Sequence, residues 1–488
     1  MSTNTMDSRM PGPAASVSLS LLRERGMGAS LLVAALSSAF GVVLISATGF
    51  IAAVLGADPY IGGSETLAVV LGIMTALLVG VAVYVAAIVT ANTFSTVVAG
   101  RTRQIALMRL IGASARAQRG EVGRQGLAVG VIGAVLGLVG GTAIAAAGVL
   151  VLTAALGIED VDYSVVQGSL LIPAVVVALT TWAAAWAGSR RVLSVTPLQA
   201  LGGSVEASHE NLSHRSGRNV AAIVLFLIGG GLLALGILAG LFTPLGVVIA
   251  FTGGILSFTG LALGATLVMP PVLRLVGRAL GSSATARLAA ENAMRYPKRS
   301  SRMAIGVVMG VTLVTMFAVA LETVKAVLTA AAGGELPGDL AVVLDGFAAI
   351  MMSLVAVSAV IAAVGLVNLL TLGIVQRRRE LGLLRALGLS NIQVRRVVLL
   401  EAAHITIAAL TAGLVLGIAY GWAGAQSLLG SVPTNPAATT ATQTLVWPAV
   451  PLWPVVVVIG ATAVLTLVAA VVPTRLATRV APVEALAE

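Results

Sequence analysis

Side chains that could do covalent or metal chemistry are scarce in this chain. It has no cysteine, which excludes disulfides, thiolate metal sites and a cysteine nucleophile. Of its three histidines, His209 and His214 lie near Glu206 and Glu210 in the polar, Gly/Ser-rich segment 202–217. These four side chains could hold a metal, but their spacing fits no standard ligand pattern. A solvated linker is therefore the favoured interpretation.

Nucleotide hydrolysis and ion coupling are disfavoured for similar reasons. A phosphate-binding P-loop needs a lysine between a glycine and a serine or threonine. The two lysines, Lys298 and Lys325, follow proline and valine, so any ATPase must be a separate polypeptide. An ion-coupled carrier needs an acid or histidine near the middle of the membrane, and an intramembrane protease needs a paired catalytic set. Glu121, Glu401 and His404 instead lie near the ends of apolar runs, where an interfacial position is expected.

The residues best suited to recognition form a basic and apolar stretch, residues 377–401, which reads RRRELGLLRALGLSNIQVRRVVLLE. Its leucines recur at helical spacing among the arginines at Leu381, Leu384 and Leu387. Gly388 suits a helix C-cap, and Ser390 with Gln393 suits the capping box of a following helix. The stretch predicts a short helix along the membrane surface and then a turn into an apolar helix. We call this arrangement an elbow.

A weaker copy of the elbow lies upstream at residues 101–125 and reads RTRQIALMRLIGASARAQRGEVGRQ. It aligns with the second elbow without a gap and at a constant offset, which places Arg101 on Arg377. Because charged and glycine positions rarely match in register by chance, we interpret the pair as an internal duplication. An elbow helix can seat its apolar face in a groove of a cytoplasmic partner or anchor the chain to lipid phosphates. The caps and the duplication favour the partner, and both uses can hold together.

The elements that position the elbows are membrane spans. The chain is 58% hydrophobic and 10% charged, with a mean hydropathy of +1.04, which indicates an integral membrane protein. The segment 14–26 fits either an interfacial helix or an extension of the first span. Ten apolar runs are long enough to cross a bilayer, near 28–56, 67–98, 122–156, 168–189, 218–241, 244–272, 302–332, 342–375, 397–429 and 447–474.

Orientation follows from the placement of the basic residues, which give the chain a net charge of +10. With the N-terminus in the cytoplasm, every inner segment is basic and only Lys325 falls outside. An even number of spans then puts both termini inside. The outer loops carry acids, namely Asp58, Glu65, Glu159, Asp160, Asp162, Glu335, Asp339 and Asp345.

The duplication extends to the chain end: SRRVLSVTPLQAL, ending at Leu201, resembles TRLATRVAPVEAL, ending at Leu486. Six spans separate equivalent positions, so the two units point the same way. We expect an all-α integral membrane protein of about ten transmembrane helices. It would have two parallel four-helix repeats, a central helix pair and no large extracellular domain. The expected domains are a cytoplasmic N-terminus (1–27), repeat 1 (28–201), a linker (202–217), the central pair (218–285) and repeat 2 (286–488).

Residues 377–402 and 101–126, together with VTPLQAL and VAPVEAL, resemble FtsX-like permease domains of the MacB/LolC type in ABC transporters. Gln104 stands where the family usually has glutamate. The ten-span layout resembles BceB-like fused permeases. Those proteins and MacB carry a large extracellular domain, for which the outer loops near 57–66 and 333–341 are too short.

In this family, the segment between the second and third spans of a unit carries a coupling helix that docks on the nucleotide-binding subunit. The resemblance assigns this ATPase-coupling role to Arg101, Arg103, Leu107, Met108, Arg109, Ile111, Gly112, Arg377, Arg379, Glu380, Leu381, Leu384, Arg385, Leu387 and Gly388.

The resemblance implies a non-catalytic permease subunit without a cofactor of its own, because ATP and Mg²⁺ would bind to the partner. Two similar elbows suit a homodimeric cytoplasmic ABC ATPase. The cargo would be lipophilic or amphipathic: a peptide, a lipid or lipoprotein, or a drug. The alternative is a signalling protein that relays ATPase motion to a partner without moving cargo. Membrane lipids are further expected partners, nucleic acid is not, and the Arg- and Ala-rich composition suggests a bacterial cytoplasmic membrane.

Overall fold

The computed structural model describes residues 27–57, 114–156, 163–194, 216–279, 283–295, 297–335, 388–432 and 444–477, with scattered positions between 72 and 91 and one at 385. Within these ranges every regular element is a helix. Among the described residues, seven helices are long and apolar enough to cross a membrane, and an eighth apolar helix is shorter. The predicted all-α membrane fold is thereby confirmed. Of the ten expected spans, 67–98 is described only at scattered positions, and 342–375 lies outside the described residues.

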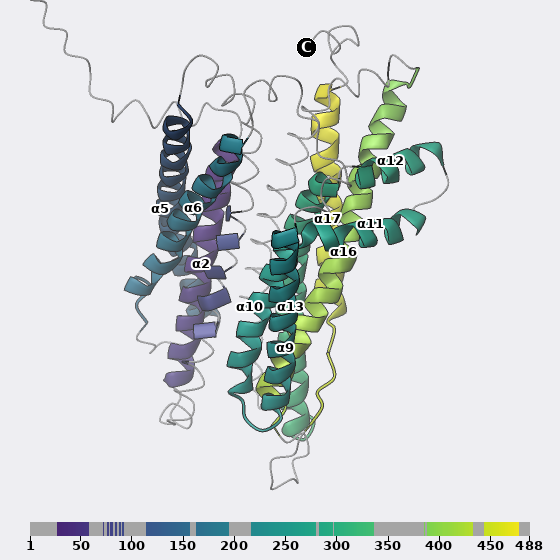
Figure 1. Ribbon diagram of the computed structural model, residues 1–488. Coiled ribbons are helices and arrows are strands. Elements are labelled where there is room, and N and C mark those ends of the chain that lie inside the picture. The colour runs from purple at the N-terminus through teal and green to yellow at the C-terminus, as the bar shows by residue number, and fades with distance from the viewer. Residues whose placement is uncertain are drawn as a thin grey trace, which may run out of the picture.

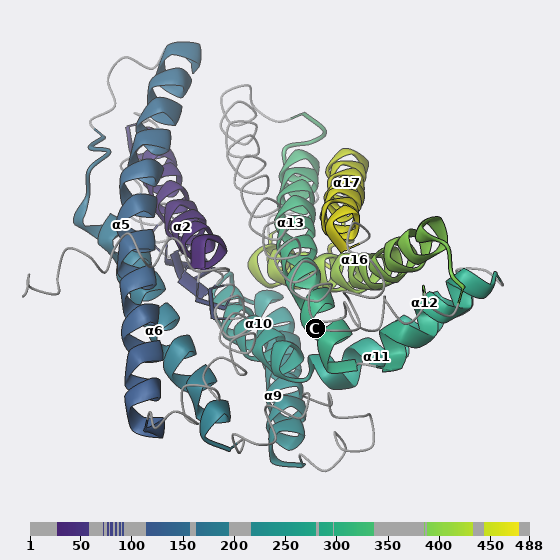
Figure 2. The same ribbon diagram turned by 90° about the horizontal axis from the view of Figure 1, so that it is seen from above.

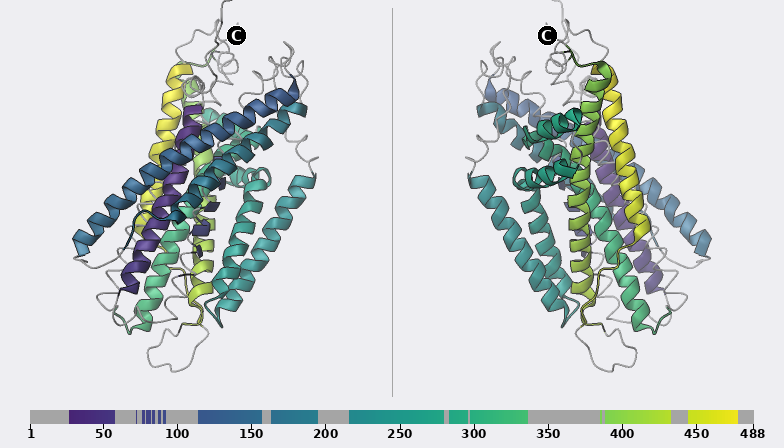
Figure 3. Two further views of the ribbon diagram at one scale, coloured as in Figure 1. Left: turned by 90° about the vertical axis from the view of Figure 1, so that its left-hand side faces the viewer. Right: turned by 90° about the vertical axis from the view of Figure 1, so that its right-hand side faces the viewer.

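Three long helices of the first unit lie in the described ranges. They are α2 (Met27–Gly56), α5 (Ala115–Leu156) and α6 (Leu171–Ser194), the last preceded by the short 3₁₀ turn η1 (Gly168–Leu170). All three pack on one another, and α5 and α6 cross α2 obliquely (Figure 3). This unit lies on one side of the molecule when it is seen from above (Figure 2).

The second unit is built from α13 (Pro297–Ala331), α16 (Asn391–Leu429) and α17 (Leu452–Ala477). Helix α16 is its centre, since it contacts α13, α17 and the four helices that come between α6 and α13 in the sequence (Figure 1). The main apolar core lies around it and includes Val308, Ile305 and Ala408, each almost fully buried.

The two units repeat one packing arrangement at equivalent positions of the sequence copies. Helix α5 begins at Ala115 and α16 begins at Asn391, two residues that the alignment of the elbows places on one another. A Cβ atom added at Gly137 of α5 would overlap the backbone of Ala35, and one added at Gly413 of α16 would lie 2.7 Å from Val311 Cβ. The same offset that aligns the elbows also places Gly137 on Gly413 and Ala35 on Val311. The first and third spans of each unit therefore approach closely at equivalent places, as small residues permit.

The central pair is a hairpin of α9 (Ser216–Gly240) and α10 (Gly246–Leu263), followed by α11 (Ala265–Ala279) and α12 (Ala284–Arg295). We expected one span over 244–272, but α10 ends at Leu263, with Gly264 as its C-cap. Helices α11 and α12 then run across the long helices (Figure 1). Pro270 and Pro271 lie inside α11 and remove two backbone donors there, whereas the break itself comes before them, at Gly264. Because α11 buries Met269 and Leu273 but exposes its arginines, it is an amphipathic helix rather than the end of a span.

The end of the second unit away from the elbow is tied by buried hydrogen bonds. The fully buried Gln426 of α16 donates from Nε2 to the Thr444 carbonyl (3.0 Å), and its Oε1 accepts from Val446 N (2.6 Å). The backbone N–H of Ala449 donates to Thr323 Oγ1 on α13 (3.1 Å). The extended segment before α17, residues 444–451, is thus fixed to both α13 and α16. We call it the outer strap.

The first unit has an analogous tie at the same end. The Tyr163 hydroxyl donates to the Ser46 carbonyl of α2 (2.7 Å), and its ring packs edge-on against Phe50 at 5.6 Å. In both units, therefore, the connection between the third and fourth spans is fastened to the first span.

Candidate functional site

Most of the predicted coupling residues lie outside the described part of the chain. This holds for Arg101, Arg103, Leu107, Met108, Arg109, Ile111 and Gly112, and for Arg377, Arg379, Glu380, Leu381, Leu384 and Leu387. Arg385 and Gly388 are described, and they stand where the second elbow turns into α16.

The turn itself has the geometry that the sequence predicts. Gly388 has a φ of +100°, the left-handed region in which glycine is favoured, and its N–H donates to the Arg385 carbonyl at 3.1 Å. Ser390 Oγ accepts from Gln393 N (3.2 Å), and Gln393 Oε1 accepts from Ser390 N (2.8 Å). The predicted capping box is confirmed, and Gly388 has the left-handed conformation that its predicted C-cap role needs. They fix the direction in which the chain enters α16.

The first two turns of α16 present two different faces. Val394 and Val397 are almost fully buried and hold the helix against the core. Ile392, Arg395 and Arg396 are exposed beside the elbow, and 65% of the Ile392 surface is accessible. An exposed isoleucine among guanidinium groups is suited to a partner with an apolar groove and acidic edges.

The start of α5 is the equivalent position in the first unit. Ser114 Oγ accepts from Ala117 N (3.1 Å), so Ser114 caps α5 as Ser390 caps α16. Ala117 has no side-chain acceptor for the Ser114 N–H, whereas Gln393 accepts from the Ser390 N–H. The start of α5 therefore has the N-cap bond but not the full capping box. The Arg119 guanidinium lies 4.0 Å from the centre of the Trp186 ring on α6, a cation–π contact that joins the two helices.

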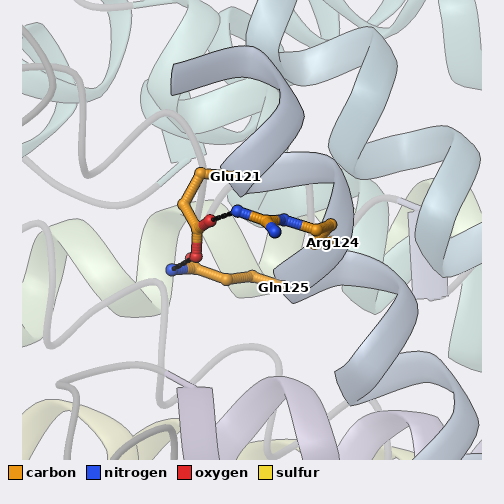
Figure 4. A network of polar contacts seen from close by, with 3 residues as sticks. All are labelled: Glu121, Arg124 and Gln125. Carbon is orange, nitrogen blue, oxygen red and sulfur yellow. Dashed lines mark hydrogen bonds and ion pairs between the residues drawn. The ribbon is translucent and has the colours of Figure 1, made fainter. Parts of the chain in front are cut away.

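Further along α5, Glu121 forms an ion pair with Arg124 and accepts a hydrogen bond from Gln125 Nε2 at 3.3 Å (Figure 4). All three side chains belong to one helix face, as Figure 4 shows. Exposed pairs of this kind contribute about 0–1 kcal/mol, so the network orients side chains more than it stabilises the fold.

Two polar residues near the second elbow, for which we expected an interfacial position, are buried inside the protein. Glu401 is 8% exposed and His404 is 1% exposed. His404 Nε2 lies 2.6 Å from the Leu273 carbonyl of α11, and since a carbonyl only accepts, Nε2 carries the proton. Gly277 leaves room for the imidazole ring. His404 thus fastens α11 to α16. The signal in the sequence was the amphipathic pattern of 265–279, which indicates that one face of this segment packs against other helices.

Metal chemistry gains no support from the residues that the structure describes, because none of them form a group of three or more histidine, cysteine or acidic side chains suited to an ion. His209 and His214 of the predicted linker lie outside the described ranges.

Comparison with protein-family models finds two matches to the FtsX-like permease C-terminal family, at residues 76–197 and 352–482, together just over half of the chain. The starts of the two matched regions are separated by the same offset as the two elbows, and each region contains one elbow. A comparison with curated proteins finds no match for the chain.

Proposed function

The chain belongs to the FtsX-like permease family, and we propose that it couples ATP hydrolysis in a separate cytoplasmic ATPase to the export or extraction of a lipophilic or amphipathic cargo. Family membership itself indicates a multi-pass ABC transporter permease, a class that is typically non-catalytic and works with a cytoplasmic ABC ATPase. The proposed partner is a homodimer that binds ATP and Mg²⁺. The proposed location is the bacterial cytoplasmic membrane, with both termini inside.

The observation that supports coupling is the rigid entry from the elbow into one long helix. Helix α16 has 39 residues, which corresponds to a length of ~58 Å. The hydrocarbon core is only ~30 Å thick. A displacement of the capped end at Ser390 is therefore transmitted along a continuous helix to Gln426 and the outer strap at its far end.

The kind of cargo is suggested by what the interior lacks. Among the described residues, the buried polar side chains are mostly serine and threonine, and Glu401 and His404 are the ionisable ones. Both of these lie in the half of α16 nearest the elbow. Because the other buried polar side chains of the described interior are hydroxyls and the Gln426 amide, none of them charged, a lipophilic cargo that moves along helix surfaces fits better than an ion.

The alternative function, ATPase-driven signalling without cargo, is favoured by one observation. The outer strap and Tyr163 fasten the outer connections to the first span of their own unit. A fastened outer end relays movement to a contact at the membrane surface without needing a cargo path.

The test is purification of the tagged chain from its native membrane, followed by mass spectrometry. We expect a stoichiometric ABC ATPase, which is lost when Leu384 and Leu387 are changed to aspartate. The matched control is aspartate at Leu445 and Leu452, which are exposed at the opposite end and should leave association intact. Full ATPase recovery with the Leu384→Asp/Leu387→Asp variant would refute docking at the elbow. Export or extraction of labelled lipid from vesicles by the reconstituted complex separates transport from signalling.

A further inference from the structure

The described positions of the second span lie between the two units. Val79 packs against the first unit's core at Val42, and Ala91 packs against the cluster that contains Val122. A different face, formed by residues spaced four apart, points to the other half: Gly80, Tyr84 and Ile88.

Helix α10 lies along this second face, and its contact residues have the same spacing of four. A Cβ atom at Gly80 would come within 2.8 Å of the Phe251 ring. One turn further, the Tyr84 hydroxyl lies 2.8 Å from Thr259 Oγ1 and 3.4 Å from the Ile255 carbonyl. Phe251, Ile255 and Thr259 are also spaced four apart, so the two helices run side by side in the same direction.

The same part of α10 is bonded to α16. Ser257 Oγ lies 2.8 Å from the Tyr420 hydroxyl. The Phe258 ring meets Tyr84 edge-on at 6.3 Å and Tyr420 edge-on at 6.2 Å. One phenylalanine therefore bridges a tyrosine of the first unit and a tyrosine of the second. We call Tyr84, Phe258 and Tyr420 the aromatic tie.

The rest of the hairpin is packed tightly on the second unit. A Cβ atom at Gly240 of α9 would lie 2.5 Å from the Ser427 backbone on α16. The two helices approach too closely here for any side chain at Gly240, so the hairpin is packed directly against α16. The hairpin meets the first unit through Gly80 and Tyr84 of the second span.

We propose that the aromatic tie positions the two elbows relative to one another, so that they move together. The second span leads directly into the first elbow, and α16 begins directly after the second. A connection from Tyr84 through Phe258 to Tyr420 therefore joins the span that precedes the first elbow to the helix that follows the second elbow. In terms of ATPase action this inference rests on the proposed function, but the tie itself is a property of this chain alone.

The test measures the distance between the units. The chain has no cysteine, so spin labels can be placed at Arg116→Cys and Ile392→Cys, two exposed and equivalent positions at the starts of α5 and α16. The distance distribution is recorded by pulsed electron paramagnetic resonance in lipid nanodiscs. Each edge-to-face ring contact changes a population ratio about 2- to 13-fold. Phe258→Ala removes both, and we expect the separated population to rise about 5- to 160-fold and the distribution to broaden.

Phe226→Ala is the matched control, because Phe226 lies on the same hairpin but is 42% exposed, and it should leave the distribution unchanged. Phe258→Leu keeps most of the apolar volume while removing the aromatic edges, so it reports on the tie even where Phe258→Ala fails to fold. A narrow, wild-type distribution in Phe258→Leu or in folded Phe258→Ala would overturn the proposal.

The ATPase provides a separate readout. If the distribution broadens in the variants but no ATPase co-purifies with the wild type, the tie stands and the proposed function fails. If an ATPase does bind, loss of the tie should lower cargo movement per ATP hydrolysed while association persists. Association with unchanged coupling in a variant with a broadened distribution would refute the positioning role.

Discussion

Replacing Gln426 with leucine should release the outer strap. The side chain of Gln426 is fully buried and makes one bond as a donor and one as an acceptor. Leucine has a similar volume but can make neither bond. The substitution leaves the Val446 N–H and the Thr444 carbonyl without these partners, while Trp422 Nε1 still donates to the Val446 carbonyl (2.6 Å).

The magnitude follows from those two groups. A buried polar group left without a partner costs about 1–3 kcal/mol, and Thr444 lies in a partly buried place, so we expect about 2–4 kcal/mol in total. Each 1.4 kcal/mol changes a population tenfold, so the open strap should become about 30- to 700-fold more populated.

The assay is labelling by a maleimide that does not cross the membrane. The Val446 side chain is 6% exposed and that of Trp447 is 80% exposed. Cysteine at 446 should react slowly in the parent chain and much faster with Gln426→Leu, whereas cysteine at 447 should react quickly in both. An unchanged rate at 446 would refute the claim that Gln426 holds the strap. Labelling of 447 from the cytoplasmic side alone would contradict the predicted orientation.

Three further predictions concern local geometry. Gly388→Ala should lower the free energy of unfolding by about 1–2 kcal/mol, because a φ of +100° is unfavourable for a residue with a side chain. Gly424→Ala, at a helical position with open space around it, should leave the free energy of unfolding unchanged, and thermal unfolding in detergent compares the two variants. Gly137→Leu should force α5 away from α2 and reduce the yield of folded protein, while Gly148→Leu, with nothing within 4 Å, should not; size-exclusion profiles decide. Burial raises the pKa of the Tyr163 phenol above its usual 10, and a hydrogen bond with the Ser46 side chain opposes the shift. The neutral phenol therefore stabilises the fold below pH 10, and that stability is lost as the pH rises through 10 and the higher folded value. A Tyr163→Phe variant with the same alkaline loss of stability would contradict this role.

Sequence reasoning succeeded where the signal is local. The cap at Gly388 and the box of Ser390 and Gln393 each depend on residues within one turn, and the apolar runs are set by the thickness of the bilayer. The duplication was also visible in one dimension, because the copies keep their spacing. Most of the predicted coupling residues lie outside the described residues, so the coupling assignment stays a prediction.

The features that sequence reasoning missed depend on contacts between distant segments. Nothing near Phe258 indicates that its ring meets Tyr84 and Tyr420, residues from two other spans. The burial of His404 likewise depends on α11, which turns across the bundle after Gly264. A hydropathy window averages over that turn, and so it extended the sixth span beyond the point where α10 ends.

The central place of α16 has a consequence for the order in which the protein is assembled during translation. The helices of the first unit are complete at Ser194 and pack on one another, so this bundle can close early. The hairpin α9–α10 is complete at Leu263, but its main partner begins only at Asn391. Until then the face of the hairpin that later receives α16, including Gly240, is covered by lipid or by the insertion machinery. During translation between Leu263 and Asn391, the first unit is complete while the α9–α10 hairpin still lacks its partner helix. Misassembly of the chain is most favoured in this interval.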